Sequence, residues 1–151
     1  MANAEFSFLV KPKDVDEVFE DFQHKSPFNL ESCIKNYRKK HKINDESQFF
    51  AMLSQEIESA YKHIKKSDYI YHNMVFYNVV IVKFRMGDKN ENKGTSDGHR
   101  VVALVDEINK IFYLLYLYKH SEGKDDLTPS EKTELKQLCD EYASKYKNSL
   151  C

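Results

Sequence analysis

Residues 100–118, RVVALVDEINKIFYLLYLY, decide the fold of this chain of 151 residues. The two ends of this stretch, Arg100 to Asp106 and Ile111 to Tyr118, are rich in the β-branched and aromatic side chains that favour extended backbone. Only Glu107 to Lys110 separates them, and so short a connection fits the turn of a hairpin. The second run is apolar on both faces, which predicts a strand in the interior of a sheet.

Another strand is predicted upstream of this hairpin. Met74 to Phe84, MVFYNVVIVKF, has the same β-branched and aromatic composition. The polar, glycine-containing stretch from Gly87 to Gly98 predicts a loop between it and the hairpin. Residues 74–118 are therefore expected to form consecutive antiparallel strands, with a further short strand at Phe6 to Val10.

Residues 1–66 are predicted to be mainly helical. Three apolar stripes recur there at the spacing of an amphipathic helix, and Ser26 followed by Pro27 favours the start of the second helix. The stripes are, in order, Val15, Val18, Phe19 and Phe22; then Leu30, Ile34 and Tyr37; then Phe50, Leu53, Ile57, Tyr61 and Ile64.

A closing helix is predicted over residues 128–146. Thr128 supplies a capping hydroxyl, Pro129 suits the first turn, and Glu131 stands at the third helical position. The buried side is marked by Leu135, Leu138 and Tyr142. The order of helices, strands and a last helix predicts an α+β fold. We expect one domain over residues 1–151, with the N-terminal helices and the closing helix packed on one face of a twisted antiparallel sheet.

Several classes of protein are disfavoured by composition. No apolar run approaches the ~18 residues of a spanning helix, and the N-terminus lacks the basic and apolar regions of a signal peptide. The three cysteines (Cys33, Cys139 and Cys151) include no Cys-x-x-Cys pair, and the six histidines show no ligand spacing. We expect a cytoplasmic protein without membrane contact, metal or cofactor.

Cations gather at the ends of the predicted strands. The net charge is −1, but residues 62–120 carry 10 basic and 6 acidic side chains, a local +4. Lys83 and Arg85 are two residues apart, so both point to one face of an extended strand. Arg100 opens the next strand and Lys119 follows the third, and we expect these two to lie side by side, next to the other pair. Converging cations repel one another unless an anion lies between them, and phosphate matches the arginine fork.

Histidines and tyrosines border these cations. His99 and His120 are available as acid or base near neutral pH. Tyr116 and Tyr118 suit a core, but a tyrosine at a sheet edge can also stack on a nucleic-acid base. Taken singly, each basic residue also fits a solvated strand end.

Two motifs carry a family resemblance. Residues 82–86 are VKFRM, and after a polar loop residues 93–102 are KGTSDGHRVV. Residues 111–138 are IFYLLYLYKHSEGKDDLTPSEKTELKQL. Together they resemble the RelE/HigB superfamily of bacterial toxins, whose members commonly show a K-x-R strand, a KGxSGGxRV-like loop and strand, and an ending similar to lllyaYsKneqedLtpkEkkeLkkl. The resemblance covers residues 74–142, with His99 in place of a tyrosine and Asp97 in place of the first paired glycine.

The resemblance implies an activity and partners. It implies the toxin of a type II toxin–antitoxin pair, an endoribonuclease that cuts mRNA, usually on the ribosome, and is held inactive by a cognate antitoxin. The implied reaction needs no metal: the 2′-hydroxyl attacks the adjacent phosphate and leaves a cyclic phosphate and a 5′-hydroxyl. It assigns charge stabilisation to Arg100 and Lys119 and proton donation to His120. The implied RNA- or phosphate-binding residues are Lys83, Arg85, Lys93 and His99.

Two other interpretations stay open. The chain could be a non-catalytic protein- or RNA-binding module that retains the RelE-like fold and uses its acidic helical half as an interaction surface. A shared fold without shared function is the third, because fold does not fix chemistry. The aligned cations favour the toxin, and the long helical half favours the binding module.

Overall fold

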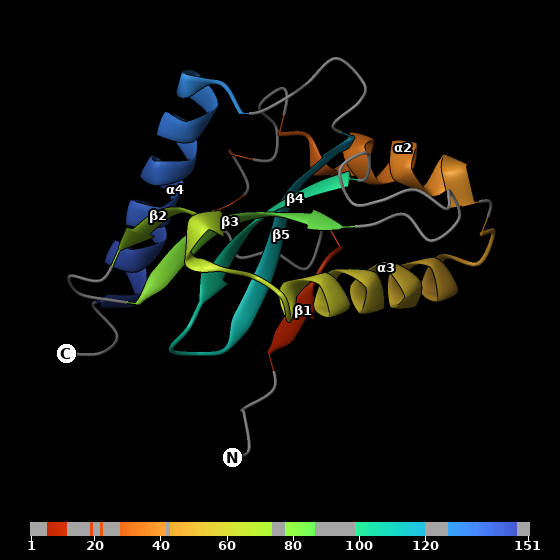
Figure 1. The fold of residues 1–151 in the computed structure, drawn as a ribbon, viewed down its shortest axis with the longest axis horizontal. Helices are drawn as coiled ribbons and strands as arrows, with labels where there is room; N and C mark the ends of the chain where they lie inside the picture. The colour runs from red at the N-terminus through yellow and green to blue at the C-terminus, as the bar shows by residue number, and fades with distance from the viewer. Residues whose placement is uncertain are drawn as a thin grey trace.

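The computed structural model describes residues 6–11, 19, 22, 28–41, 43–73, 78–86, 99–119 and 127–147. They form an α+β fold around a five-stranded mixed sheet with the strand order β1-β5-β4-β3-β2 (Figure 1). The strands are β1 (Ser7–Leu9), β2 (Tyr69–Asn73), β3 (Val79–Met86), β4 (His99–Asp106) and β5 (Ile111–Lys119). The helices are α2 (Leu30–His41), α3 (Glu46–Tyr61) and α4 (Pro129–Lys147), with a 3-10 turn η3 (Lys66–Asp68).

The predicted hairpin and the strand before it are confirmed. β3, β4 and β5 pair antiparallel in sequence order, and residues 100–118 contain no helix. The turn that joins β4 to β5 is held by Asp106, whose Oδ1 accepts hydrogen bonds from the backbone N–H groups of Ile108 (3.0 Å) and Asn109 (2.9 Å). Lys110 adopts a left-handed φ of 59° to close it. β5 lies between β1 and β4, an interior position that explains its apolar character on both faces.

The sheet differs from the prediction at both edges. β1 pairs parallel with β5, with Ser7 opposite Ile111, so the sheet is mixed and the expectation of a wholly antiparallel sheet is wrong. At the other edge, β2 pairs antiparallel with β3 and was not predicted. β3 begins at Val79, later than the expected Met74, and residues 74–77 lie outside the described residues.

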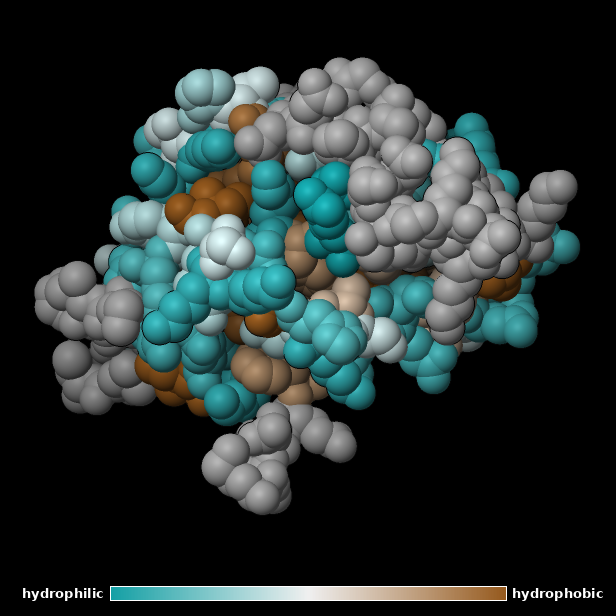
Figure 2. All heavy atoms as spheres, in the orientation of Figure 1, coloured by the Kyte–Doolittle hydropathy of each residue, from teal (hydrophilic) through white to brown (hydrophobic). Residues whose placement is uncertain are grey.

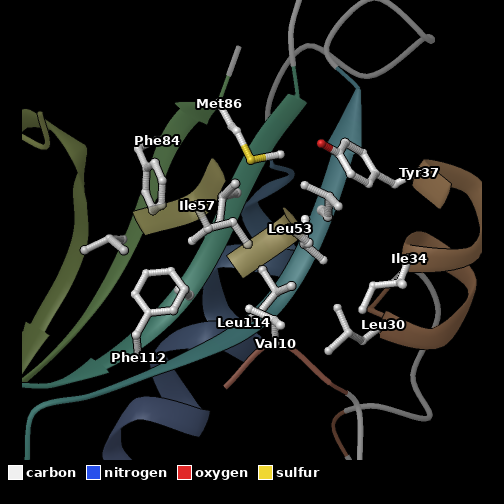
Figure 3. Close-up of a cluster of buried hydrophobic side chains, with 14 of the residues drawn as sticks. Val10, Leu30, Ile34, Tyr37, Leu53, Ile57, Phe84, Met86, Phe112 and Leu114 are labelled. Atoms are coloured by element: carbon white, nitrogen blue, oxygen red, sulfur yellow. The ribbon is translucent and has the colours of Figure 1, made fainter. Parts of the chain in front are cut away.

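The helices cover both faces of the sheet. We call the side covered by α3 the α3 face and the side covered by α4 the α4 face. On the α3 face, side chains such as Phe84, Phe112 and Leu114 meet Leu53 and Ile57 of α3 (Figure 3). On the α4 face, a second cluster joins strand residues to Leu135, Leu138, Cys139, Tyr142 and Ala143 of α4. The expectation that helices lie on one face is therefore wrong, because alternate residues of β3, β4 and β5 are apolar on both sides and both sides need cover.

The predicted helical stripes are buried where the structure describes them. Leu30, Ile34 and Tyr37 are buried along α2, and Phe50, Leu53 and Ile57 are buried along α3, which ends at Tyr61 before Ile64. Phe19 and Phe22 are buried on the α4 face. Val15, Val18, Ser26 and Pro27 lie outside the described residues.

The start of α4 has the predicted capping box. The Thr128 hydroxyl accepts from the Glu131 backbone N–H (3.1 Å), and the Glu131 carboxylate accepts from the Thr128 backbone N–H (2.8 Å). None of the helices in the described part of the chain is both long and apolar enough to cross a membrane. The visible face of the molecule is largely hydrophilic, with small separate hydrophobic patches (Figure 2).

Asp140 fastens α4 to the edge strand β2. Its Oδ1 accepts hydrogen bonds from the Tyr71 hydroxyl (2.7 Å) and from Asn73 Nδ2 (2.9 Å). The hydrogen bond to Asp140, followed by burial, raises the pKa of Tyr71 from 10.0 to about 12. The neutral phenol is thus the form that the folded protein favours.

This bond predicts a pH-dependent contribution to stability. Since the pKa of Tyr71 is higher in the folded chain, the contribution is complete below pH 10 and is lost as the pH rises toward 12. We expect Tyr71→Phe to remove one tyrosine titration near pH 12 in an ultraviolet absorbance titration. We expect Asp140→Asn to move that titration down toward pH 10. A Tyr71 that titrates near 10 in the unaltered chain would contradict the bond.

Candidate functional site

Three of the predicted cations share one face of the sheet. Arg85 of β3 and Arg100 of β4 are directly opposite each other in the register. Lys83, two residues before Arg85, is opposite Val102, which packs on the α4 face. Because side chains alternate along a strand, all three cations lie on the α4 face at the end of the sheet where β4 begins. This confirms the expected neighbourhood of Lys83, Arg85 and Arg100.

The three cations differ in exposure. The Arg85 side chain is exposed, Lys83 is half-buried, and Arg100 is only 5% exposed. Like charges directly opposite on neighbouring strands repel each other, and this row brings three basic side chains together on one face of the sheet. An exposed guanidinium at its centre can meet a phosphate with two parallel hydrogen bonds.

Two tyrosines of β5 complete the row. Tyr118 is opposite Arg100 and Tyr116 is opposite Val102, and their ring centroids are 5.2 Å apart. Phe28 meets Tyr116 edge-on at 5.3 Å. Burial is the largest cause that raises the pKa of Tyr116 above its ordinary value, followed by the charges of Cys33 and Glu131. The Tyr116 phenol therefore keeps its proton at neutral pH.

The remaining described candidates lie on the opposite face. Lys119 is opposite His99 in the register, and His99 points toward α2, where its ring meets Tyr37 edge-on at 4.7 Å. His99 is 5% exposed and Lys119 is half-buried. The expectation that Arg100 and Lys119 lie side by side is wrong, because they occupy successive register rows and opposite faces.

A β-bulge in β5 causes this difference. From the pair Asp106 and Ile111, an unbroken register would place Arg100 opposite Leu117, with Lys119 on the same face. The register shifts between Val102 and Ala103, and one extra residue enters β5 at that point. Leu115 and the residue after it then both face α4, and every later side chain of β5 changes face.

Two of the candidate residues lie outside the described part of the chain. Lys93 belongs to the segment 87–98, and His120 follows directly after β5; neither is among the described residues. Their assignments to phosphate binding and proton donation stay predictions.

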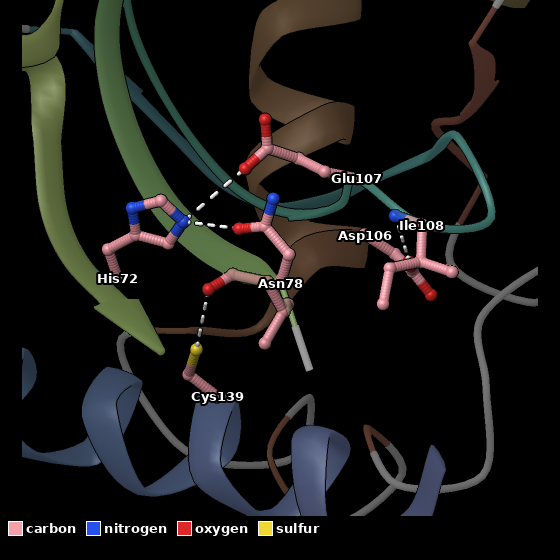
Figure 4. Close-up of polar contacts among 7 residues, drawn as sticks. His72, Asn78, Asp106, Glu107, Ile108 and Cys139 are labelled. Atoms are coloured by element: carbon pink, nitrogen blue, oxygen red, sulfur yellow. Dashed lines mark hydrogen bonds and ion pairs between the residues drawn. The ribbon is translucent and has the colours of Figure 1, made fainter. Parts of the chain in front are cut away.

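A second polar cluster, missed by sequence reasoning, lies at the other end of the sheet. His72 Nε2 is 3.4 Å from Glu107 Oε1 and meets Asn78 Oδ1 (Figure 4). Burial, followed by the charge of Glu107, raises the pKa of the nearby Tyr69. The cluster ties β2 to the turn between β4 and β5. Glu107 is far from His72 and Asn78 in sequence, and the three residues have no ligand-like spacing, so no sequence motif predicts the cluster.

The described part of the chain contains no candidate metal site. No group of three or more histidine, cysteine, aspartate or glutamate side chains there is arranged to hold an ion. Cys139 is buried, and its thiol contacts the Val79 carbonyl oxygen at 3.8 Å. Burial raises the pKa of Cys139 to about 12, which makes it an unreactive thiol.

Comparison of the chain with protein-family models, with curated proteins and with solved structures gives no match. The geometry of the described residues therefore carries the functional argument.

Proposed function

We propose that this chain is an RNA endonuclease that works without a metal, the toxin of a type II toxin–antitoxin pair. The observation that carries the proposal is the row of Lys83, Arg85 and Arg100 on one face of the sheet, bordered by tyrosines. We call this set, together with Tyr116 and Tyr118, the cation row. It offers positive charge and proton-bearing hydroxyls, the two requirements of metal-free phosphate chemistry.

The chemistry assigns different tasks within the cation row. The RNA 2′-hydroxyl attacks the adjacent phosphate, and the 5′-oxygen leaves as a hydroxyl, so negative charge builds on the non-bridging oxygens. The exposed Arg85 contacts these oxygens, and the nearly buried Arg100 adds fixed positive charge beneath them. Low solvent exposure strengthens the contribution of Arg100, because charges interact more strongly away from water.

A RelE-like fold is part of the proposal. Its support is the order of the described elements: a short strand, two helices, a run of antiparallel strands and a closing helix with the predicted capping box. Further support is that α2 and α3 lie against one side of the sheet, which leaves the cation row on the other. On this proposal the partners are mRNA, a cognate antitoxin and the ribosome, and the site of action is the cytoplasm.

A non-catalytic RNA-binding module is the second candidate. The observation in its favour is the placement of Lys119 on the opposite face from Arg100, which removes one predicted charge from the reacting phosphate. Binding needs only the exposed Arg85 and the half-buried Lys83.

Cleavage in the absence of metal separates the two candidates. Purified full-length chain is incubated with a reporter mRNA in excess chelator, alone and in a translating extract. We expect fragments with a 2′,3′-cyclic phosphate and a 5′-hydroxyl, and growth arrest on expression that a co-expressed neighbouring antitoxin relieves. Binding of intact RNA without cleavage in either setting would exclude the endonuclease and support the module.

A further inference from the structure

The most basic stretch of the chain lies outside the cation row. Residues 32–44 contain five lysines and arginines and no aspartate or glutamate, in a protein whose net charge is −1. They belong mainly to α2. Cations in the last turn of a helix complement its dipole, but that effect concerns only the final turn. Lys35 lies before it.

The described basic residues of α2 divide into two kinds. Arg38 is half-buried and holds the connection to α3: its guanidinium donates to the backbone carbonyls of Ile43 (3.1 Å) and Asn44 (2.7 Å) and lies over the Phe49 ring at 5.4 Å. Lys35 and Lys39 are exposed and stand one turn apart on one side of the helix. Arg38 therefore holds the C-terminal end of α2 to the connection with α3. Lys35 and Lys39 are exposed and can contact a ligand.

α2 brings these lysines to the same end of the sheet as the cation row. β1 pairs only with residues 111–113 of β5, and α2 packs along the rest of β5 (Figure 1). The contact between Tyr37 and His99 places the C-terminal half of α2 against the start of β4, next to Arg100. Lys119, opposite His99, is the last residue of β5 and lies on the α3 face.

The described acidic residues near this end are few, and one of them lies on the lysine side of α2: Glu31 is exposed and stands one turn before Lys35. Asp45 and Glu46 stand at the start of α3, and the Asp45 carboxylate accepts from the Gln48 backbone N–H. Glu131 is 7% exposed and closes the capping box of α4. Asp106 and Glu107 are at the opposite end of β4. Among the described residues, basic side chains thus recur from the cation row, around the end of β4 and β5, to α2.

We infer that α2 is an accessory binding surface for the RNA phosphate backbone, engaged through Lys35 and Lys39. This inference rests on the proposed function of the cation row and specifies its substrate: an RNA strand that extends beyond the reacting phosphate. A single phosphate or dinucleotide engages the cation row alone. A longer strand engages both surfaces and gains affinity through electrostatic contacts that depend on salt but not on base sequence.

The test compares two double variants of the full chain that lose the same charge. Lys35→Ala with Lys39→Ala removes the proposed contacts. Lys62→Ala with Lys136→Ala removes two exposed lysines, one at the end of α3 and one on α4, and is the matched control. Binding is measured with 2′-O-methyl RNA, which lacks the attacking hydroxyl, at lengths of about 4 and about 16 nucleotides. Salt is varied over roughly 50 to 200 mM.

We expect the α2 variant to bind the longer RNA roughly tenfold more weakly, with the slope of log affinity against log salt reduced by about 1.4, or ~0.7 per lost phosphate contact. Binding of the short RNA is expected to stay unchanged, and so is the control variant. An unchanged slope in the α2 variant, or an equal loss in the control, would overturn the inference. Cleavage of unmodified RNA in chelator, measured in parallel, reports on the proposed function: its absence refutes the endonuclease whatever the lysine variants show.

Discussion

Replacing Arg85 with alanine is expected to lower the rate of RNA cleavage roughly a hundredfold while leaving the fold intact. Loss of one preorganised charge contact to a transition state costs ~3 kcal/mol of barrier. The Arg85 side chain is exposed, and substitutions at exposed positions usually change stability by within ~0.5 kcal/mol. Rate and stability should therefore separate clearly at this position. The measurement is initial cleavage rate in chelator beside a thermal melt of each variant.

Arg85→Ala is a sharper test than the same change at Arg100. Arg100 is 5% exposed, so its loss also alters packing on the α4 face and stability would fall together with rate. Lys62→Ala provides a matched control, because Lys62 is an exposed cation at the end of α3, the helix that covers the other face of the sheet. Equal cleavage by the unaltered chain and by Arg85→Ala, at equal melting temperature, would remove the cation row as an active site.

Lys119 gives the same experiment an internal comparison. The sequence placed it beside Arg100, but the register places it on the α3 face. If one face carries the chemistry, Lys119→Ala should lower the cleavage rate much less than Arg85→Ala does. A loss as large as that of Arg85→Ala would show that the reacting phosphate lies at the strand ends and not on the α4 face.

The strands could be predicted because their composition leaves few alternatives. RVVALVD and IFYLLYLY, residues 100–106 and 111–118, are too β-branched, aromatic and apolar for a loop, and the four residues between them allow only a tight turn. β2 escaped prediction because YIYHN at residues 69–73 is short and partly polar. The parallel partner of β1 is decided by tertiary packing, which no local pattern contains.

The apolar character of β5 on both faces already implies that helices cover both faces of the sheet. A strand that is apolar on both faces, as Ile111–Lys119 is, needs apolar partners on both faces. The prediction recognised that β5 is interior but kept all helices on one side. α4, with its buried Leu135 and Tyr142, supplies the second layer.

Part of the candidate site could be predicted, because the sequence indicates which residues stand at the strand ends. It does not indicate on which face of the sheet each of these side chains lies. Lys83 and Arg85 share a face by simple alternation, and Arg85 meets Arg100 because the antiparallel register between β3 and β4 is unbroken. Between β4 and β5 the bulge adds one residue and reverses the faces of Tyr118 and Lys119. No local sequence pattern around Leu115 predicts the β-bulge.

Asp106 carries the largest expected effect on stability. Its side chain is fully buried, and its carboxylate accepts from the backbone N–H groups of Ile108 and Asn109, from Asn109 Nδ2 (3.1 Å) and from the Tyr142 hydroxyl (2.7 Å). It thus joins the turn between β4 and β5 to α4. Burial and then the hydrogen bond to Asp106 raise the pKa of Tyr142 far above its ordinary value, so the phenol donates throughout the ordinary pH range.

We expect Asp106→Ala to lower the free energy of unfolding by roughly 3 kcal/mol, because it removes the acceptor of the turn and leaves the buried Tyr142 hydroxyl without this partner. For a chain of this size the melting temperature should fall by about 10 °C. Tyr142→Phe should cost less, about 1 kcal/mol, because the turn keeps its bonds. Once Asp106 is alanine, the Tyr142→Phe change should cost less than in the unaltered chain, since the bond to Asp106 is already gone and only the hydrogen bond with Tyr113 remains to be lost. Additive losses in the double variant would show that the turn and α4 are stabilised independently, and that Asp106 does not join them.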